Sequence, residues 1–312
     1  MKVYRELKDF KKLKNAIVTT GTYDGVHKGH RKILQSIVDS ALSDNGETVV
    51  ITFWPHPRKI VGDGDIDTIK YLSTLDEKVE LLSTLGIDHL LIIPFNREFS
   101  ELSSEDFIKN VLVDLIGTKK LVIGYDHRFG KNREGSFDYL NKYSQRYGFV
   151  VQEIPRQDLN DIAVSSTEIR NALSKGDVAK AALYLDQRYR LKGIVVKGKQ
   201  LGRTIGFPTA NIKVNDVDKL IPFGGVYAVQ VKYDDTIYGG MLNIGFRPTL
   251  EGLDRTIEVF IHDFDKEIYG EELEVFFVEF IRQEQKFSGV DLLKLQLEKD
   301  RIDSLRILAN SI

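Results

Sequence analysis

Residues 16–30 read AIVTTGTYDGVHKGH, a β-branched run followed by a glycine-rich turn. Apolar residues at helical spacing come next: Ile33, Leu34, Ile37, Val38, Ala41 and Leu42. Glycines let a backbone approach an anion closely, and a helix N-terminus offers N–H groups and a positive partial charge. We therefore predict a phosphate site at Gly21–His30, in which His27 and His30 donate to phosphate oxygens.

Strand and helix patterns alternate from about residue 16 to residue 153. The strands predicted after the first are 48–53, 90–93, 120–123 and 149–154. The predicted helices are one that a Thr74–Glu77 capping box opens and Gly86 ends, and two more at 107–115 and 137–147. Such alternation is typical of a parallel sheet with helices on both faces, which binds ligands at the carboxyl ends of its strands.

Two further polar loops follow predicted strands, at 52–57 and 124–130. They should converge with the first turn, and the three loops hold four of the six histidines: His27, His30, His56 and His127. Residues 164–170, VSSTEIR, could add hydroxyls, helix N–H groups and Arg170 as a second phosphate clamp. Other interpretations remain open here: a glycine turn with surface histidines, a zinc site, and a common Ser/Thr helix cap.

The pattern changes near residue 185. Strand-like runs separated by turn signals predict an antiparallel β-barrel or sandwich, at 191–196, 226–233, 236–244, 256–263 and 274–280. A helix over 290–308 should close it, and a helical join is expected at 177–189. Residues 193–211 hold three loop glycines, Gly198, Gly202 and Gly206, in a spacing that is not a Walker A loop. A glycine-rich hairpin explains this segment equally well.

Composition limits the classes of protein. The chain has 312 residues, a net charge of −2, a pI near 6.3 and no cysteine. Two domains are expected, while disulfides, thiolate zinc ligands and a thiol nucleophile are excluded. The acidic pI argues against broad nucleic-acid binding. The N-terminus lacks an apolar signal core and the apolar stretches are too short to span a membrane, so a cytoplasmic protein is expected.

The motif Asp24-Gly-Val-His-x-Gly-His, together with Ser165-Ser-Thr-x-Ile-Arg170, resembles the adenylyltransferase module of bacterial FAD synthetases, which are nucleotidyltransferases. The resemblance implies a Rossmann-like domain. It implies ATP contacts from Gly21, Asp24, His27, His30, Ser166, Thr167 and Arg170, with His27 and His30 catalytic. It implies that Pro55, His56, Asp126 and Arg128 help to bind flavin. Tyr23 replaces the family's usual Phe.

The later segments resemble the riboflavin kinase module, whose hallmark is Pro208-Thr-Ala-Asn211. The resemblance implies that Thr209 and Asn211 hold Mg²⁺ and ATP phosphates, and that Glu258 is the general base; by spacing alone Glu258 could simply face outward. It assigns the remaining kinase ATP contacts to Gly198, Gly202, Arg203, Gly206 and Pro208, and flavin contacts to Arg282 and Glu284. Leu185–Tyr189 departs from the family's Leu-Gly-Arg-Pro-Tyr-like start.

The resemblance covers about residues 15–287 and implies two activities. Residues 1–184 would adenylylate FMN to FAD, and residues 185–312, an antiparallel barrel with a C-terminal helix, would phosphorylate riboflavin to FMN. The expected partners are riboflavin, FMN, ATP and Mg²⁺, without nucleic acid or membrane; the oligomeric state is left open. The alternatives are a single activity, on another phosphate compound such as a pantetheine or nicotinate derivative, and a non-catalytic flavin-binding sensor.

Overall fold

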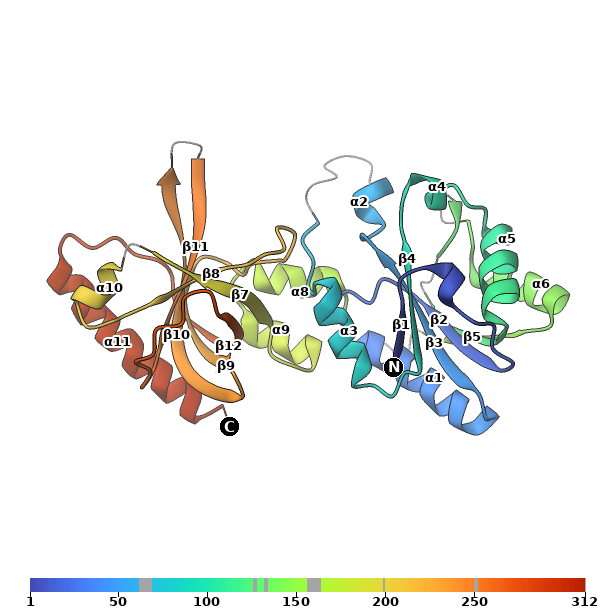
Figure 1. Cartoon of the computed structure of the whole chain (residues 1–312), viewed down its shortest axis with the longest axis horizontal. Coiled ribbons are helices and arrows are strands. Elements are labelled where there is room, and N and C mark those ends of the chain that lie inside the picture. Colours follow the sequence, from blue (N-terminus) through green and yellow to red (C-terminus); the bar gives the residue numbers. More distant parts are fainter. Residues whose placement is uncertain are drawn as a thin grey trace. The chain divides into compact units, whose positions relative to one another are not determined.

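The structure, a computed structural model, describes residues 1–61, 69–125, 128–131, 134–155, 164–198, 200–249 and 252–311, without the side chains of 247–249 and 252–254. The chain forms two compact units, Met1–Ser166 and Thr167–Ile312 (Figure 1). The predicted division of the two activities at residues 184 and 185 stays a prediction. No helix within the described ranges is both long enough and apolar enough to cross a membrane.

The first unit contains a six-stranded sheet in the order β1-β4-β3-β2-β5-β6, and every neighbouring pair is parallel. Its strands are β1 (Lys2–Tyr4), β2 (Ala16–Thr20), β3 (Glu47–Trp54), β4 (His89–Pro94), β5 (Thr118–Gly124) and β6 (Val150–Ile154). The predicted parallel sheet is confirmed. Edge strand β1 was not predicted, because three residues show too little alternation to be recognised.

Helices cover both faces of this sheet (Figure 1). Ala16 and Val18 of β2 pack with the helices on one face, whereas Ile17 between them packs with those on the other. The first face carries η2 (Phe107–Ile116) and α6 (Phe137–Tyr147); the second carries α1 (Lys28–Asp44) and α3 (Leu75–Ser83). Since successive side chains of a strand point to opposite faces, both faces of β2 are buried. Short elements complete the unit: η1 (Leu7–Asp9), α2 (Arg58–Val61), α4 (Arg97–Ser100) and α5 (Ser104–Asp106).

The strand order reverses at β2. The chain proceeds from β2 to β3 and β4 on one side, and then returns to place β5 and β6 on the other side of β2. Ligands of parallel sheets bind outside the carboxyl ends of the strands at such a reversal. The turn after β2 begins at Gly21, so the fold places the glycine-rich turn at this position.

The second unit begins with two helices and continues into a closed barrel. The helices are α8 (Ser166–Leu173, whose first residue belongs to the first unit) and α9 (Val178–Leu185). The barrel order is β10-β11-β8-β7-β12-β9. Its strands are β7 (Arg190–Val196), β8 (Ala210–Lys213), β9 (Gly225–Tyr233), β10 (Thr236–Thr249), β11 (Gly252–Ile261) and β12 (Glu272–Arg282). Because this sheet is closed, the second unit is a barrel and not a sandwich, the two folds between which the sequence did not decide. The short helix α10 (Leu201–Thr204) and the C-terminal α11 (Val290–Ala309) complete the unit.

Candidate functional sites

The glycine-rich turn after β2 has an unusual backbone. Tyr23, Gly25 and Val26 have φ angles of 47°, 80° and 43°. Glycine tolerates this left-handed region, whereas a β-branched residue such as Val26 rarely enters it. The turn leads directly into α1, whose N-cap is His27. The predicted sequence of strand, turn and helix is therefore present, with backbone strain in the turn.

A buried carboxylate holds this turn. Asp24 is 2% exposed, and its Oδ1 accepts hydrogen bonds from the backbone N–H groups of Leu72 at 3.0 Å and Ser73 at 3.1 Å. The Ser73 hydroxyl in turn accepts from the N–H of Gly25 at 3.0 Å. Asp24 thus joins the turn to the segment that precedes α3. Its predicted contact with ATP stays a prediction beside this structural role.

The two predicted catalytic histidines lie face to face. The rings of His27 and His30 stack with centroids 3.6 Å apart, and Nδ1 of His27 accepts the backbone N–H of His30 at 3.4 Å. Nδ1 of His30 is buried and has no hydrogen-bond partner among the described residues. Burial lowers the pKa of His30 well below its usual value, and His27 and Lys78 lower it further. His30 is therefore neutral at physiological pH and has donor and acceptor capacity for a ligand.

Lys78, which the sequence analysis did not select, lies behind the turn. It is 2% exposed, and its Nζ donates to the carbonyl oxygen of Thr22 at 2.7 Å. Thr52 of β3 donates its hydroxyl to the same oxygen at 3.2 Å. Lys78 follows the predicted Thr74–Glu77 capping box, in which each side chain accepts the other residue's backbone N–H. The capping box marks where the helix begins and does not indicate that Lys78 is buried against the turn.

The other predicted residues of the first site fall in several places. The Ser166 hydroxyl donates to the carbonyl oxygen of Asp24 at 3.2 Å, so this one member of the predicted clamp lies at the turn. Pro55 and His56 follow β3, and the ring of His56 stacks on that of Tyr71 with the ring centroids 6.5 Å apart. The remaining members are simply located: Thr167 and Arg170 lie on α8 in the second unit, Arg128 is exposed, and Asp126 and His127 lie outside the described residues. Their roles stay predictions.

In the second unit, the predicted base and metal ligands meet on neighbouring strands. Glu258 of β11 pairs in register with Asn211 of β8, and the Thr209 hydroxyl donates to Oε2 of Glu258 at 3.3 Å. Ile257 and Val259 are buried, so Glu258 points to the opposite, outer side of the barrel wall, where it is half-buried. The outward orientation and the predicted site are therefore compatible. Asn243 of β10 is opposite Glu258 on its other side, and the sequence analysis did not select it.

Glycines shape the loop in front of these residues. A Cβ on Gly198 would come within 2.5 Å of Cγ of Asn211, so the absent side chain provides the space that the Asn211 amide occupies. Gly206 has a φ of 88°, and the N–H of Phe207 donates to the carbonyl oxygen of Gly202 at 2.8 Å. Arg203 and Pro208 are exposed. The loop joins the antiparallel strands β7 and β8, as the hairpin interpretation predicted, and turns tightly around Asn211.

The two predicted flavin contacts of the kinase differ. Arg282 donates from Nε and an Nη to the two carboxylate oxygens of Asp300 in α11, at 2.8 and 2.6 Å, and Asp300 is 1% exposed. Its guanidinium therefore anchors the C-terminal helix. Glu284 lies over Gly245, where an added Cβ would be 3.1 Å from Glu284 Cδ and from Asn243 Nδ2. Glu284 thus lies close to Asn243, the strand neighbour of Glu258, whereas Arg282 holds α11 through Asp300.

The oxygen donors around Glu258 fit Mg²⁺. The hydroxyl of Thr209, the amide of Asn211 and the carboxylate of Glu258 supply hard oxygens, and Mg²⁺ commonly takes few protein ligands and completes its shell with water and phosphate oxygens. Within the described ranges, no group of three or more His, Asp or Glu residues could hold a metal ion. The Mg²⁺ site at Thr209 and Asn211 stays a prediction.

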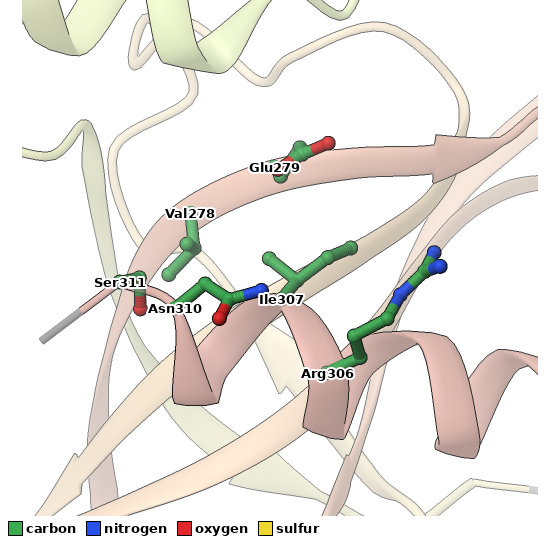
Figure 2. Close-up of a pocket in the computed structure, with 6 residues that line it drawn as sticks. All are labelled: Val278, Glu279, Arg306, Ile307, Asn310 and Ser311. Carbon is green, nitrogen blue, oxygen red and sulfur yellow. The ribbon is translucent and has the colours of Figure 1, made fainter.

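A separate open hollow lies between β12 and α11 (Figure 2). It has a volume of about 350 Å³ and is lined by Val278, Glu279, Arg306, Ile307, Asn310 and Ser311. Strand β7 separates β12 from β8 and β11 in the barrel order. This hollow is therefore not part of the Thr209–Glu258 group.

Comparison with protein families assigns a class to each part of the chain. Residues 9–168 match the family model for FAD synthetase, and residues 185–308 match the one for riboflavin kinase. The chain thus combines a nucleotidyltransferase unit built on the parallel sheet with a flavokinase unit built on the closed barrel.

Full-length relatives carry both modules. A bifunctional riboflavin kinase/FMN adenylyltransferase of Listeria monocytogenes is 40% identical over 95% of this chain and 93% of its own length. One from Escherichia coli K12 is 36% identical over 92% of this chain and 90% of its own. This chain belongs to the family of bifunctional riboflavin kinase/FMN adenylyltransferases. A crystal structure described as a macrolide-efflux protein from Streptococcus pneumoniae aligns over 97% of both chains, with 30% identity and a TM-score of 0.87.

Proposed function

We propose that this chain converts riboflavin to FAD in two ATP-dependent steps, one in each unit. The observation that carries the proposal is the meeting of Thr209 and Glu258, which are 49 residues apart in sequence and 3.3 Å apart in space, with Asn211 in register. A glutamate that simply faced the solvent would not be expected to have both of these polar side chains as neighbours. Because both steps consume ATP, we place the protein in the cytoplasm.

In the barrel, the 5′-hydroxyl of riboflavin attacks the γ-phosphorus of ATP, giving FMN and ADP. Glu258 accepts the proton of that hydroxyl, as a carboxylate within hydrogen-bond reach can. Thr209 and Asn211 would hold Mg²⁺ and the phosphates, and the metal when bound would supply positive charge against the transferred phosphoryl group. We assign a flavin contact to Glu284, and its closeness to Asn243 supports this assignment.

In the parallel-sheet unit, a phosphate oxygen of FMN attacks the α-phosphorus of ATP and pyrophosphate leaves. No protein nucleophile is required, so the protein contributes positioning and charge stabilisation. The strained turn, the helix N-terminus and the His27–His30 pair supply donors on one side of the phosphates. Ser166, Thr167 and Arg170 supply them on the other, and Pro55, His56, Asp126 and Arg128 help to bind the flavin.

A flavin time course tests both steps together. The purified protein is incubated with riboflavin, ATP and Mg²⁺, and riboflavin, FMN and FAD are separated at intervals. We expect FMN to form and FAD to follow. Absence of both products in folded protein would reject the proposal, and turnover of a pantetheine or nicotinate compound without flavin would favour a single activity on another substrate.

Two variants assign the steps to the units. Glu258→Gln keeps the size of the side chain but removes the base, so riboflavin phosphorylation should fall by about 10²–10⁴-fold while FMN adenylylation continues. His30→Ala should lower adenylylation by about 10²-fold or more and leave phosphorylation unchanged. Loss of both activities in either variant would contradict independent sites.

A further inference from the structure

The turn that follows β2 is strained and must be held by its surroundings. Tyr23 and Val26 both have left-handed φ angles, and Val26 is fully buried. A non-glycine residue in this region costs about 1–3 kcal/mol and persists where neighbouring groups determine its conformation. Side chains that fix this turn are therefore candidates for a functional role.

Two buried groups of opposite charge fix the turn from behind. The Asp24 carboxylate accepts the N–H groups of Leu72 and Ser73, which leaves the carboxylate facing the start of α3. The Lys78 ammonium, on α3, is the donor of the second bond, which it makes to the Thr22 carbonyl oxygen of the turn at 2.7 Å. The side chain of Asp24 thus attaches the turn to the segment before α3, and the carbonyl of Thr22 attaches it to α3 itself.

Folding alone does not account for an ammonium at this place. Lys78 is 2% exposed, and its Nζ lies 5.3 Å from the centre of the Trp54 ring. Burial lowers its pKa from 10.5 to about 8, against the opposing influence of Asp24. Because burying a charge is costly and an apolar side chain of similar length would cost less free energy, a buried lysine next to a strained turn points to function.

We propose that Lys78 is a positioning residue for adenylyl transfer: its ammonium holds the Thr22 carbonyl and thereby keeps the turn and the paired histidines aimed at the phosphates of ATP. This inference rests on the proposed function of the first unit. In this proposal Lys78 acts through the turn, by its hydrogen bond to the Thr22 carbonyl oxygen.

A dependence on pH follows from the groups around the ammonium. Asp24 of the turn and His30 of α1 face Lys78, and His27 stacks on His30. His30 remains neutral above pH 7, whereas the Lys78 ammonium loses its proton near pH 8. The kcat/KM of adenylyl transfer reports the free enzyme and should decline as pH rises through about 8.

The test is the substitution Lys78→Met in the full-length protein, with Lys109→Met as the control. Lys109 lies in the same unit, is half-exposed and pairs with Asp114 at 3.0 Å on the surface. We measure kcat and KM of FMN adenylylation between pH 6.5 and 9.5, riboflavin phosphorylation, and the melting of the first unit. A displacement of the turn by about 1 Å should lower kcat/KM for ATP by about 10²-fold in Lys78→Met and leave Lys109→Met unchanged.

The outcomes separate positioning from stability. Positioning requires that Lys78→Met melts at the wild-type temperature or higher, retains riboflavin phosphorylation and no longer shows the decline above pH 8. Adenylylation within threefold of wild type, or loss of rate with the decline still present, overturns the inference. If the first unit of Lys78→Met does not fold, the pH profile of the wild-type protein provides the test. A wild-type kcat/KM for FMN adenylylation that stays constant from pH 7 to 9.5 also overturns the inference. Wild-type protein without adenylylation would instead reject the proposed function.

Discussion

Replacing Gly198 by alanine should displace a single proposed magnesium ligand. The new Cβ would lie 2.5 Å from Cγ and 2.7 Å from Oδ1 of Asn211. Ordinary contacts at such a Cβ begin at 3.4 Å, so the Asn211 amide must move by roughly 1 Å. A misplacement of that size in a positioning group costs about 10²-fold in rate. We therefore expect Gly198→Ala to lower kcat/KM of riboflavin phosphorylation by about 10²-fold.

The assay follows FMN formation from riboflavin at several Mg²⁺ concentrations, and FMN adenylylation in the same preparation serves as the internal standard. A displaced ligand should also raise the Mg²⁺ concentration that gives half-maximal rate. The matched control is Gly289→Ala, because Gly289 has an extended φ of −168° and no atom within 4 Å of an added Cβ. Full phosphorylation by folded Gly198→Ala, at an unchanged Mg²⁺ requirement, would refute the role given to Asn211.

Three further predictions concern stability. Burial holds the pKa of His30 well below its usual value, so below pH about 6.5 the unfolded chain binds a proton there that the folded chain does not. The free energy of unfolding of the first unit should therefore decrease as the pH is lowered from 8 to 5. In urea titrations over this range, His30→Gln should make that decrease smaller. Thr74→Ala removes the hydroxyl that accepts the Glu77 N–H, and should cost about 1 kcal/mol in the same titrations at pH 7; an unchanged midpoint would contradict the cap. Asp300→Ala leaves the largely buried Arg282 without its carboxylate partner and should destabilise the second unit by about 3 kcal/mol by calorimetry, whereas an equal melting temperature would show that the pair contributes little.

The sequence predicted the elements with strong periodicity. The predicted helix 137–147 coincides with α6, and β2 has the predicted bounds. The Thr74–Glu77 capping box is confirmed, although α3 ends at Ser83 before the predicted Gly86. The short strands β1 and β8 were not predicted, because each is recognisable from its pairing with distant strands and not from its own residues.

The candidate sites were predictable where a motif is local and not where the contact is long-range. The turn Gly21–His30 was visible because glycine and histidine spacing lies within ten residues. Lys78 was not, since its contact with Thr22 joins residues 56 positions apart and a lysine near a helix start is usually a surface residue. Arg282 could be located in a motif, but its bidentate pair with Asp300 depends on how α11 packs.

The alternation along β11 separates two demands that an engineer would treat together. Ile257 and Val259 fill the interior, and Glu258 between them carries the proposed chemistry on the outside. Substitutions at interior positions can therefore adjust the heat resistance of the barrel without entering the nucleotide site, provided that the strand keeps its register. A one-residue slip would exchange the two faces and lose both properties at once.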